Sequence, residues 1–131
     1  MVPLRYLSVD EVRALHEVMM ERLGSPPSSL RDPGLLESAV ARPQMAAHYE
    51  SADLVRQAAL LALGIAQNQP YLDGNKRTAL LAAIVFLEVN GMRFTGDDLE
   101  AARQLELVAK RLDSLEAAGG RFERWLRDHS T

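Results

Sequence analysis

Two apolar segments meet across a short polar loop in "AALLALGIAQNQPYLDGNKRTALLAAIVFLEVN", residues 58–90. Each segment is hydrophobic on nearly every side of a helix, which is typical of helices that are buried inside a domain. Between them, Pro70 and Gly74 interrupt the helical pattern. We therefore expect two central helices, at about 52–68 and 75–90, with Ser51 as the N-cap of the first.

Two further helices are predicted before this central pair. The stretch "SVDE" at 8–11 is a capping-box pattern, so we expect a helix that begins there and ends at Gly24. Asp32 followed by Pro33 is typical of an N-cap and the first position of a helix. That second helix is expected to be short and to stop at Pro43.

Two more helices are predicted after the central pair. "TGDD" at 95–98 has the form of a capping box, with Asp98 in the Glu position, and leads a helix to about Arg111. A last amphipathic helix is expected at about 121–128. The sequence thus predicts an all-α fold of about six helices around two apolar ones.

Length and composition limit the classes of protein to consider. The chain has 131 residues, 47% of them hydrophobic and 25% charged, which fits a single globular domain over 1–131. The net charge of −3 does not suggest a general nucleic-acid binder. There are no cysteines, and the longest apolar runs are too short to span a bilayer, so we expect a cytoplasmic protein with no membrane partner.

The polar loop has the chemistry of an anion site. It lies directly before a helix, whose first N–H groups lack intrahelical partners and sit in a positive potential. Lys76 and Arg77 add two full charges, and Asn75 supplies a donor and an acceptor. Gly74 has no Cβ to keep a ligand from the backbone. These features predict a phosphate site.

Asp73 adds a carboxylate beside that site. Mg²⁺ is usually held by one or two carboxylates together with substrate phosphate oxygens, so Asp73 is a candidate metal ligand. An ordinary capped loop, with Asp73 as N-cap and Lys76 and Arg77 solvated, explains the same residues about equally well at this stage.

Several stretches resemble one known family. "QPYLDGNKRTA" at 69–79 is similar to the signature of the Fic/Doc family, His-x-Phe-x-Asp/Glu-Gly/Ala-Asn-Gly/Lys-Arg. "RDPGLLESAVARPQ" at 31–44, "YLSVDEVRALHE" at 6–17 and "LEVNGMRF" at 87–94 are similar to its Doc (death-on-curing) branch. The resemblance covers most of the chain and implies the compact, all-helical Fic/Doc core.

The resemblance also implies an activity. Fic enzymes of one type transfer AMP from ATP to a protein hydroxyl. Doc toxins of type II toxin–antitoxin systems instead transfer the γ-phosphate of ATP to a translation elongation factor, and an antitoxin with a disordered tail neutralises them. Lys76 stands where AMP-transferring members have Gly, and Leu80 stands where they have a second Arg. Both differences favour the Doc-type kinase, with AMP transfer as the alternative.

Site residues follow from the matched positions. Asp73 would bind Mg²⁺, while Gly74, Asn75, Lys76 and Arg77 would hold the phosphates of ATP. Gln69 stands where the family has the His that serves as general base. An amide cannot accept the proton, and general-base catalysis is worth ~10²–10⁴ in rate, so the chain should bind nucleotide but transfer phosphate poorly.

Two origins of Gln69 remain open: a deliberate substitution that disables a toxin, and a natural homologue that only binds nucleotide or antitoxin. The three histidines, His16, His48 and His129, show no metal-ligand spacing. We expect them to be at the surface or partly buried, and none is a replacement base. Tyr71, in the place of the family's Phe, is expected to face the core.

Overall fold

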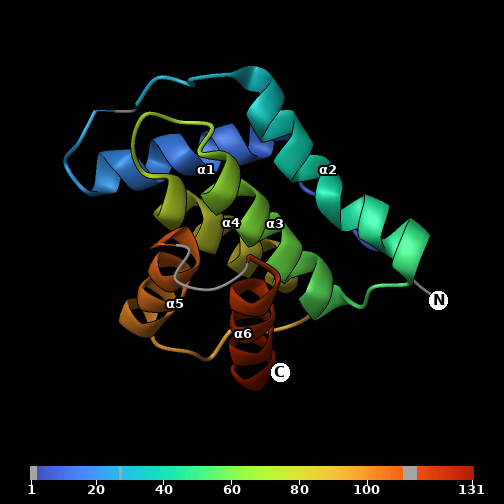
Figure 1. Ribbon diagram of the computed structural model, residues 1–131. Helices are drawn as coiled ribbons and strands as arrows, with labels where there is room; N and C mark the ends of the chain where they lie inside the picture. Colours follow the sequence, from blue (N-terminus) through green and yellow to red (C-terminus); the bar gives the residue numbers. More distant parts are fainter. Residues whose placement is uncertain (1–2, 27, 111–114) are drawn as a thin grey trace.

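The fold is a set of packed helices, as expected (Figure 1). The computed structural model describes residues 3–26, 28–110 and 115–131. Within these residues the chain forms six α-helices: α1 (Val9–Arg22), α2 (Pro33–Glu50), α3 (Leu54–Asn68), α4 (Asn75–Val89), α5 (Asp98–Lys110) and α6 (Leu115–Asp128). No helix of the described residues is long and apolar enough to cross a membrane.

Helix α3 is the centre of the fold. It packs against α2, α4, α5 and α6, and α1 lies across α4 and α2 (Figure 1). Most of its residues from Val55 to Ala66 are buried, as its nearly continuous apolar sequence predicts. An ideal Cβ on Gly64 would lie 3.1 Å from the Cα of Ala39, so the small residue lets α2 approach α3 closely.

A short extended segment, 28–31, lies alongside the loop between α3 and α4. Leu30 and Tyr71 form an antiparallel bridge, and the N–H of Leu72 donates to the carbonyl of Ser29 at 3.1 Å. The N–H of Arg31 donates to the carbonyl of Pro70. The loop is therefore fixed by backbone bonds to a segment about forty positions earlier in the chain.

The prediction that Pro43 ends a short helix was wrong. Helix α2 passes through Pro43 and continues to Glu50. A proline in a helix interior removes one backbone hydrogen bond, which disfavours the helix locally. Pro43 is buried in the face that includes Leu36 and Ala39, and this packing offsets the lost bond. As a result, His48 lies on α2 and not in a loop.

Two helices are capped by a residue two positions after the predicted N-cap. Ser51 has φ 53° and ends α2, while Asp53 caps α3 by accepting from the N–H of Arg56 at 2.9 Å. Similarly, Asp97 accepts from the N–H of Glu100, whereas the hydroxyl of Thr95 donates to the carbonyl of His129. In both cases an Asp side chain, which is a strong N-cap, lies closer to the helix start.

Other boundaries agree with the prediction or extend it. The Ser8 capping box and the Asp32 N-cap are confirmed. Helix α6 begins at Leu115 and not near 121, so that Gly119 and Gly120 lie within the helix; Phe122 and Leu126 are fully buried. The predicted end of the preceding helix at Arg111 lies outside the described residues.

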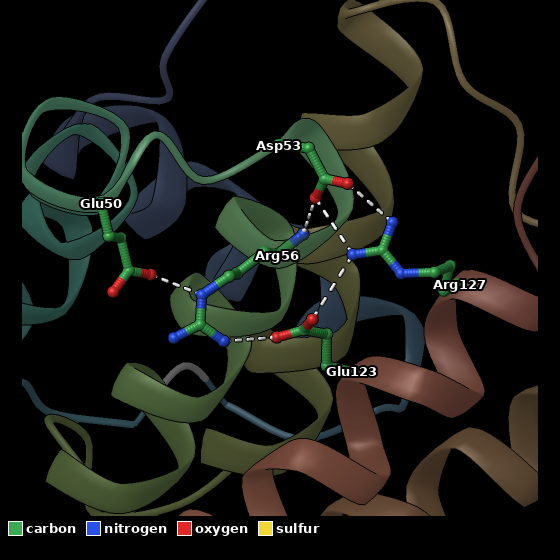
Figure 2. A network of polar contacts seen from close by, with 5 residues as sticks. All are labelled: Glu50, Asp53, Arg56, Glu123 and Arg127. Atoms are coloured by element: carbon green, nitrogen blue, oxygen red, sulfur yellow. Dashed lines mark hydrogen bonds and ion pairs between the residues drawn. The ribbon is translucent and has the colours of Figure 1, made fainter.

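A network of ion pairs joins the ends of α2 and α3 to α6 (Figure 2). Arg56 pairs with Glu50 and with Glu123, the latter at 2.7 Å. Arg127 pairs with Asp53 at 2.7 Å and with Glu123 at 3.4 Å. These contacts hold the C-terminal helix against the N-terminal end of α3, on the opposite end of α3 from its polar loop.

Candidate active site

The polar loop opens onto a pocket of about 670 Å³. All six residues singled out in the sequence line it: Gln69, Asp73, Gly74, Asn75, Lys76 and Arg77. Met20 of α1 and Leu23 at the C-cap of that helix, together with Ala66 and Leu72, are apolar residues of its lining. The structure thus brings the whole predicted set to one cavity, which has both charged and apolar residues in its lining.

Gln69 ends α3 in the left-handed conformation, with φ 48° and ψ 60°. Such a conformation is uncommon for a residue other than glycine. Arg31 supports it: its Nε donates to the carbonyl of Gln69 at 3.0 Å, and its guanidinium also donates to the carbonyl of Asn68 at 3.1 Å. A cation on the last carbonyls of a helix is favourable. The side chain of Gln69 is exposed at the pocket.

The N-terminus of α4 supplies the two cations of the pocket lining. Gly74 is its N-cap, and no side chain caps it, unlike the N-termini of α1, α2 and α3. Its first N–H groups therefore remain open to a ligand. Lys76 and Arg77 are exposed in this first turn, and within the described residues neither has an ion-pair partner. Two unpaired cations at the positive end of a helix favour a bound anion.

The predicted alternative of Asp73 as N-cap is not what the structure shows. Its carboxylate accepts from the N–H of Gly74 at 2.8 Å, one residue short of the helix. Asp73 is exposed at the pocket. Within the described residues, no three His, Asp or Glu side chains gather as a complete metal site. One carboxylate fits Mg²⁺ that takes its other ligands from phosphate and water.

The side chain of Asn75 is used to brace the loop. Its Oδ1 accepts from the N–H of Tyr71 at 2.9 Å, and its Nδ2 donates to the carbonyl of Tyr71 at 2.8 Å. Asn75 therefore acts on a ligand mainly through its backbone N–H and the loop shape, although its amide keeps one further N–H.

Gly74 also packs closely against α1. Its φ of +83° suits glycine, and an ideal Cβ would point towards α1, 3.0 Å from the Sδ of Met20 and 3.1 Å from Cε1 of His16. The missing side chain thus allows the loop to pack on α1. Glycine therefore serves the packing of the loop here, while its expected role in ligand access stays a prediction.

His16 was expected at the surface or partly buried, and this was wrong. Its ring is 1% exposed. It lies within hydrogen-bond distance of Thr78 on α4 and of Ser28, and stacks on Tyr71. A signal was available in the sequence, because His16 lies four residues from Val12 and four from Met20, on the buried face of α1.

Tyr71 faces the core, as expected, and is 4% exposed. Its hydroxyl has no hydrogen-bond partner among the described residues. Burial raises the pKa of Tyr71, so the phenol remains neutral. The ring is the apolar anchor of the loop.

The sequence was compared with known families and curated proteins. The model of the Fic/DOC family matches residues 6–87. Toxin Doc of Mycolicibacterium smegmatis is 44% identical over 95 residues, which cover 67% of this chain and 73% of that protein. Protein kinase doc of Escherichia phage P1 is 36% identical over 91 residues, which cover 69% of this chain and 71% of that protein.

The family match includes α1, α2, α3 and most of α4, and thus the loop, the uncapped helix end and the cations at the pocket. The matches agree with the resemblance carried by the loop sequence and with the all-helical fold. The chain therefore belongs to the Fic/DOC family, in its Doc branch.

Proposed function

We propose that this chain is a Doc-type toxin whose pocket binds ATP with Mg²⁺ and is built to transfer the γ-phosphate to a protein hydroxyl. The observation that carries the proposal is the gathering of Asp73, Lys76 and Arg77 at the uncapped N-terminus of α4, in one open pocket. A similar protein that is named a protein kinase supports phosphate transfer.

In this reaction, the oxygen of the acceptor hydroxyl forms a bond to the γ-phosphorus, and the bond from that phosphorus to the β–γ bridging oxygen breaks. ADP leaves. The family resemblance implies a His at position 69 to take up the hydroxyl proton; with Gln69 in its place, the proton has to pass to solvent water. Arg77 and Lys76 bind phosphate oxygens, while the open N–H groups of α4 bind others. Mg²⁺ held by Asp73 would supply charge neutralisation on the phosphates.

Gln69 limits this chemistry. Its side chain can donate or accept a hydrogen bond but cannot take up the proton. The pocket otherwise has every group that the family resemblance calls for. We therefore propose that the chain binds ATP and transfers phosphate slowly, whichever origin Gln69 has.

The substrate and the partner are proposals of the same kind. Doc resemblance points to the elongation factor that delivers aminoacyl-tRNA as the phosphate acceptor, and to an antitoxin whose disordered tail folds on the toxin. Both belong in the cytoplasm, where translation takes place. Similarity to a protein that is named a toxin supports the lineage.

The test uses Gln69→His with ATP labelled at the γ- or the α-phosphate and the purified elongation factor. We expect γ-label transfer to rise by ~10²–10⁴ over the unsubstituted chain. Arg77→Gln should reduce it again, while Arg124→Gln, a change at an exposed arginine of α6, should not. Transfer of the α-label alone would establish AMP transfer in its place. A folded Gln69→His protein that labels nothing would contradict both.

A further inference from the structure

His16 contacts three segments that lie next to pocket residues in the chain: α4, the segment 28–31 and the loop between α3 and α4. Its Nδ1 lies 2.8 Å from the hydroxyl oxygen of Thr78, one turn into α4, and its Nε2 lies 3.1 Å from the hydroxyl oxygen of Ser28. Its ring lies against Tyr71, with centroids 3.7 Å apart. Every polar atom of this buried imidazole therefore has a partner, which is the condition under which burial of a polar ring is tolerated.

Ser28 carries the contact on to Asp73. Its hydroxyl donates to the carbonyl of Asp73 at 2.8 Å, and its oxygen accepts from the N–H of Asp73 at 3.3 Å. Ser28 therefore binds both backbone groups of the candidate metal ligand. Within the described residues, Asp73 makes no backbone–backbone hydrogen bond outside the helices.

These partners fix the proton on the ring. The single proton of Ser28 is used on the carbonyl of Asp73, so Nε2 of His16 must donate to Ser28. Nδ1 must then accept from the hydroxyl of Thr78. A neutral imidazole with its proton on Nε2 satisfies the whole chain of bonds from α4 through α1 to the loop.

We infer that His16 is a positioning residue of the nucleotide site. Through Ser28 it fixes the backbone that carries the Asp73 carboxylate, and through Thr78 it fixes the first turn of α4, whose N–H groups face the same pocket. The effect of His16 on Mg²⁺ and phosphate binding rests on the proposed function. The effect of His16 on the position of the loop does not depend on it.

The experiment compares variants that separate the effect of the hydrogen bonds of His16 from the effect of its packing on Tyr71. His16→Phe keeps an aromatic ring against Tyr71 and removes both hydrogen bonds, and Ser28→Ala removes only the link to Asp73. His16→Gln retains a donor for Ser28. Phe122→Leu, a change in the buried face of α6, controls for a general loss of stability.

Two measurements are made on each folded protein. The first is the hydrogen exchange of the Asp73 N–H, which should become faster in His16→Phe and Ser28→Ala but not in Phe122→Leu. The second is the Mg²⁺ concentration that half-saturates ATP binding. Loss of a group that orients a metal ligand typically weakens metal binding about 10- to 100-fold, so we expect at least a tenfold rise, largely reversed in His16→Gln.

The results distinguish the two proposals. The inference is overturned if His16→Phe changes neither the exchange rate of the Asp73 N–H nor the half-saturating Mg²⁺ concentration. It is also overturned if the exchange becomes faster but the Mg²⁺ concentration does not change, because the loop would then move without effect on the site. An equal change in Phe122→Leu would show a general stability effect and would also overturn it. If the unsubstituted chain binds no Mg²⁺ and ATP, the proposed function fails, while the exchange at Asp73 still decides whether His16 positions the loop.

Discussion

The imidazole ring of His16 lies flat on the phenol ring of Tyr71, with centroids 3.7 Å apart and 6° between the two planes. The stack joins α1 to the loop that carries Asp73. The phenol hydroxyl of Tyr71 is also buried and has no hydrogen-bond partner among the described residues. The aromatic ring of Tyr71 thus stabilises the loop, while its unpartnered hydroxyl lowers the stability of the folded chain.

Replacing Tyr71 with Phe should separate these two contributions. A buried hydroxyl without a partner costs roughly 1–3 kcal/mol, and removing it without a change in shape is nearly neutral or stabilising. We expect the free energy of unfolding of Tyr71→Phe to be unchanged or higher by about 1 kcal/mol, as measured by urea denaturation. Tyr71→Leu, which loses the stack, should be clearly less stable. A marked loss in Tyr71→Phe would show that the hydroxyl has a partner.

Local signals in the sequence were enough for much of the fold. The Ser8 capping box, the Asp32–Pro33 start and the apolar interiors of α3 and α4 each depend on residues within one or two turns. Pro43 could not be predicted in this way, because its tolerance depends on the packing of α2 against α3, and the residues around Pro43 give no local signal of that contact. Tertiary packing commonly overrides such local preferences.

The same difference between local signals and long-range contacts applies to the site. Gln69 and residues 73–77 could be predicted because they lie in one short stretch of the chain, and the structure places them around one pocket. Ser28 and Thr78, which brace the loop through His16, were missed because their contacts cross from α1 to residues 12 and 62 positions away. The role of Asn75 was also missed, since its amide is satisfied by the backbone of Tyr71.

His16 should make stability depend on pH in mildly acidic solution. Burial lowers its pKa from 6.5, although Asp73 and Glu17 act in the opposite direction. The unfolded chain then binds more protons, so the free energy of unfolding falls as pH decreases below about 6.5 and until the folded pKa is passed. In His16→Phe this part of the decrease should be absent. Denaturation curves at a series of pH values measure it, and identical slopes would contradict the prediction.

The ion pair between Asp53 and Arg127 should contribute little by itself. Both side chains are about half exposed, and exposed pairs typically contribute about 0.2–1 kcal/mol. We expect a double-mutant cycle with Asp53→Asn, which keeps a capping side chain, and Arg127→Gln to give a coupling in that range.

Salt provides the control for this cycle. At about 1 M salt the Debye length is only about 3 Å, so the coupling should fall markedly. A parallel cycle of Asp53→Asn with Arg124→Gln should give a coupling near zero, because Arg124 does not belong to the network (Figure 2). Coupling that persists unchanged in salt would indicate packing, not charge, as its source.

Alanine at Gly74 and at Gly91 should differ in cost, although both residues have similar backbone angles, φ +83° and +91°. Each substitution places a Cβ in a left-handed conformation, which costs on the order of 1 kcal/mol. At Gly91 the new Cβ meets nothing within 4 Å, whereas at Gly74 it would approach Met20 and His16 to 3.0 and 3.1 Å. Overpacking of this kind typically adds about 1–3 kcal/mol.

We expect Gly74→Ala to be less stable than Gly91→Ala by that amount in urea denaturation. Gly74→Ala should also weaken ATP binding, whereas Gly91→Ala should not. Equal effects of the two substitutions would show that α1 yields to the new methyl group and does not fix the loop.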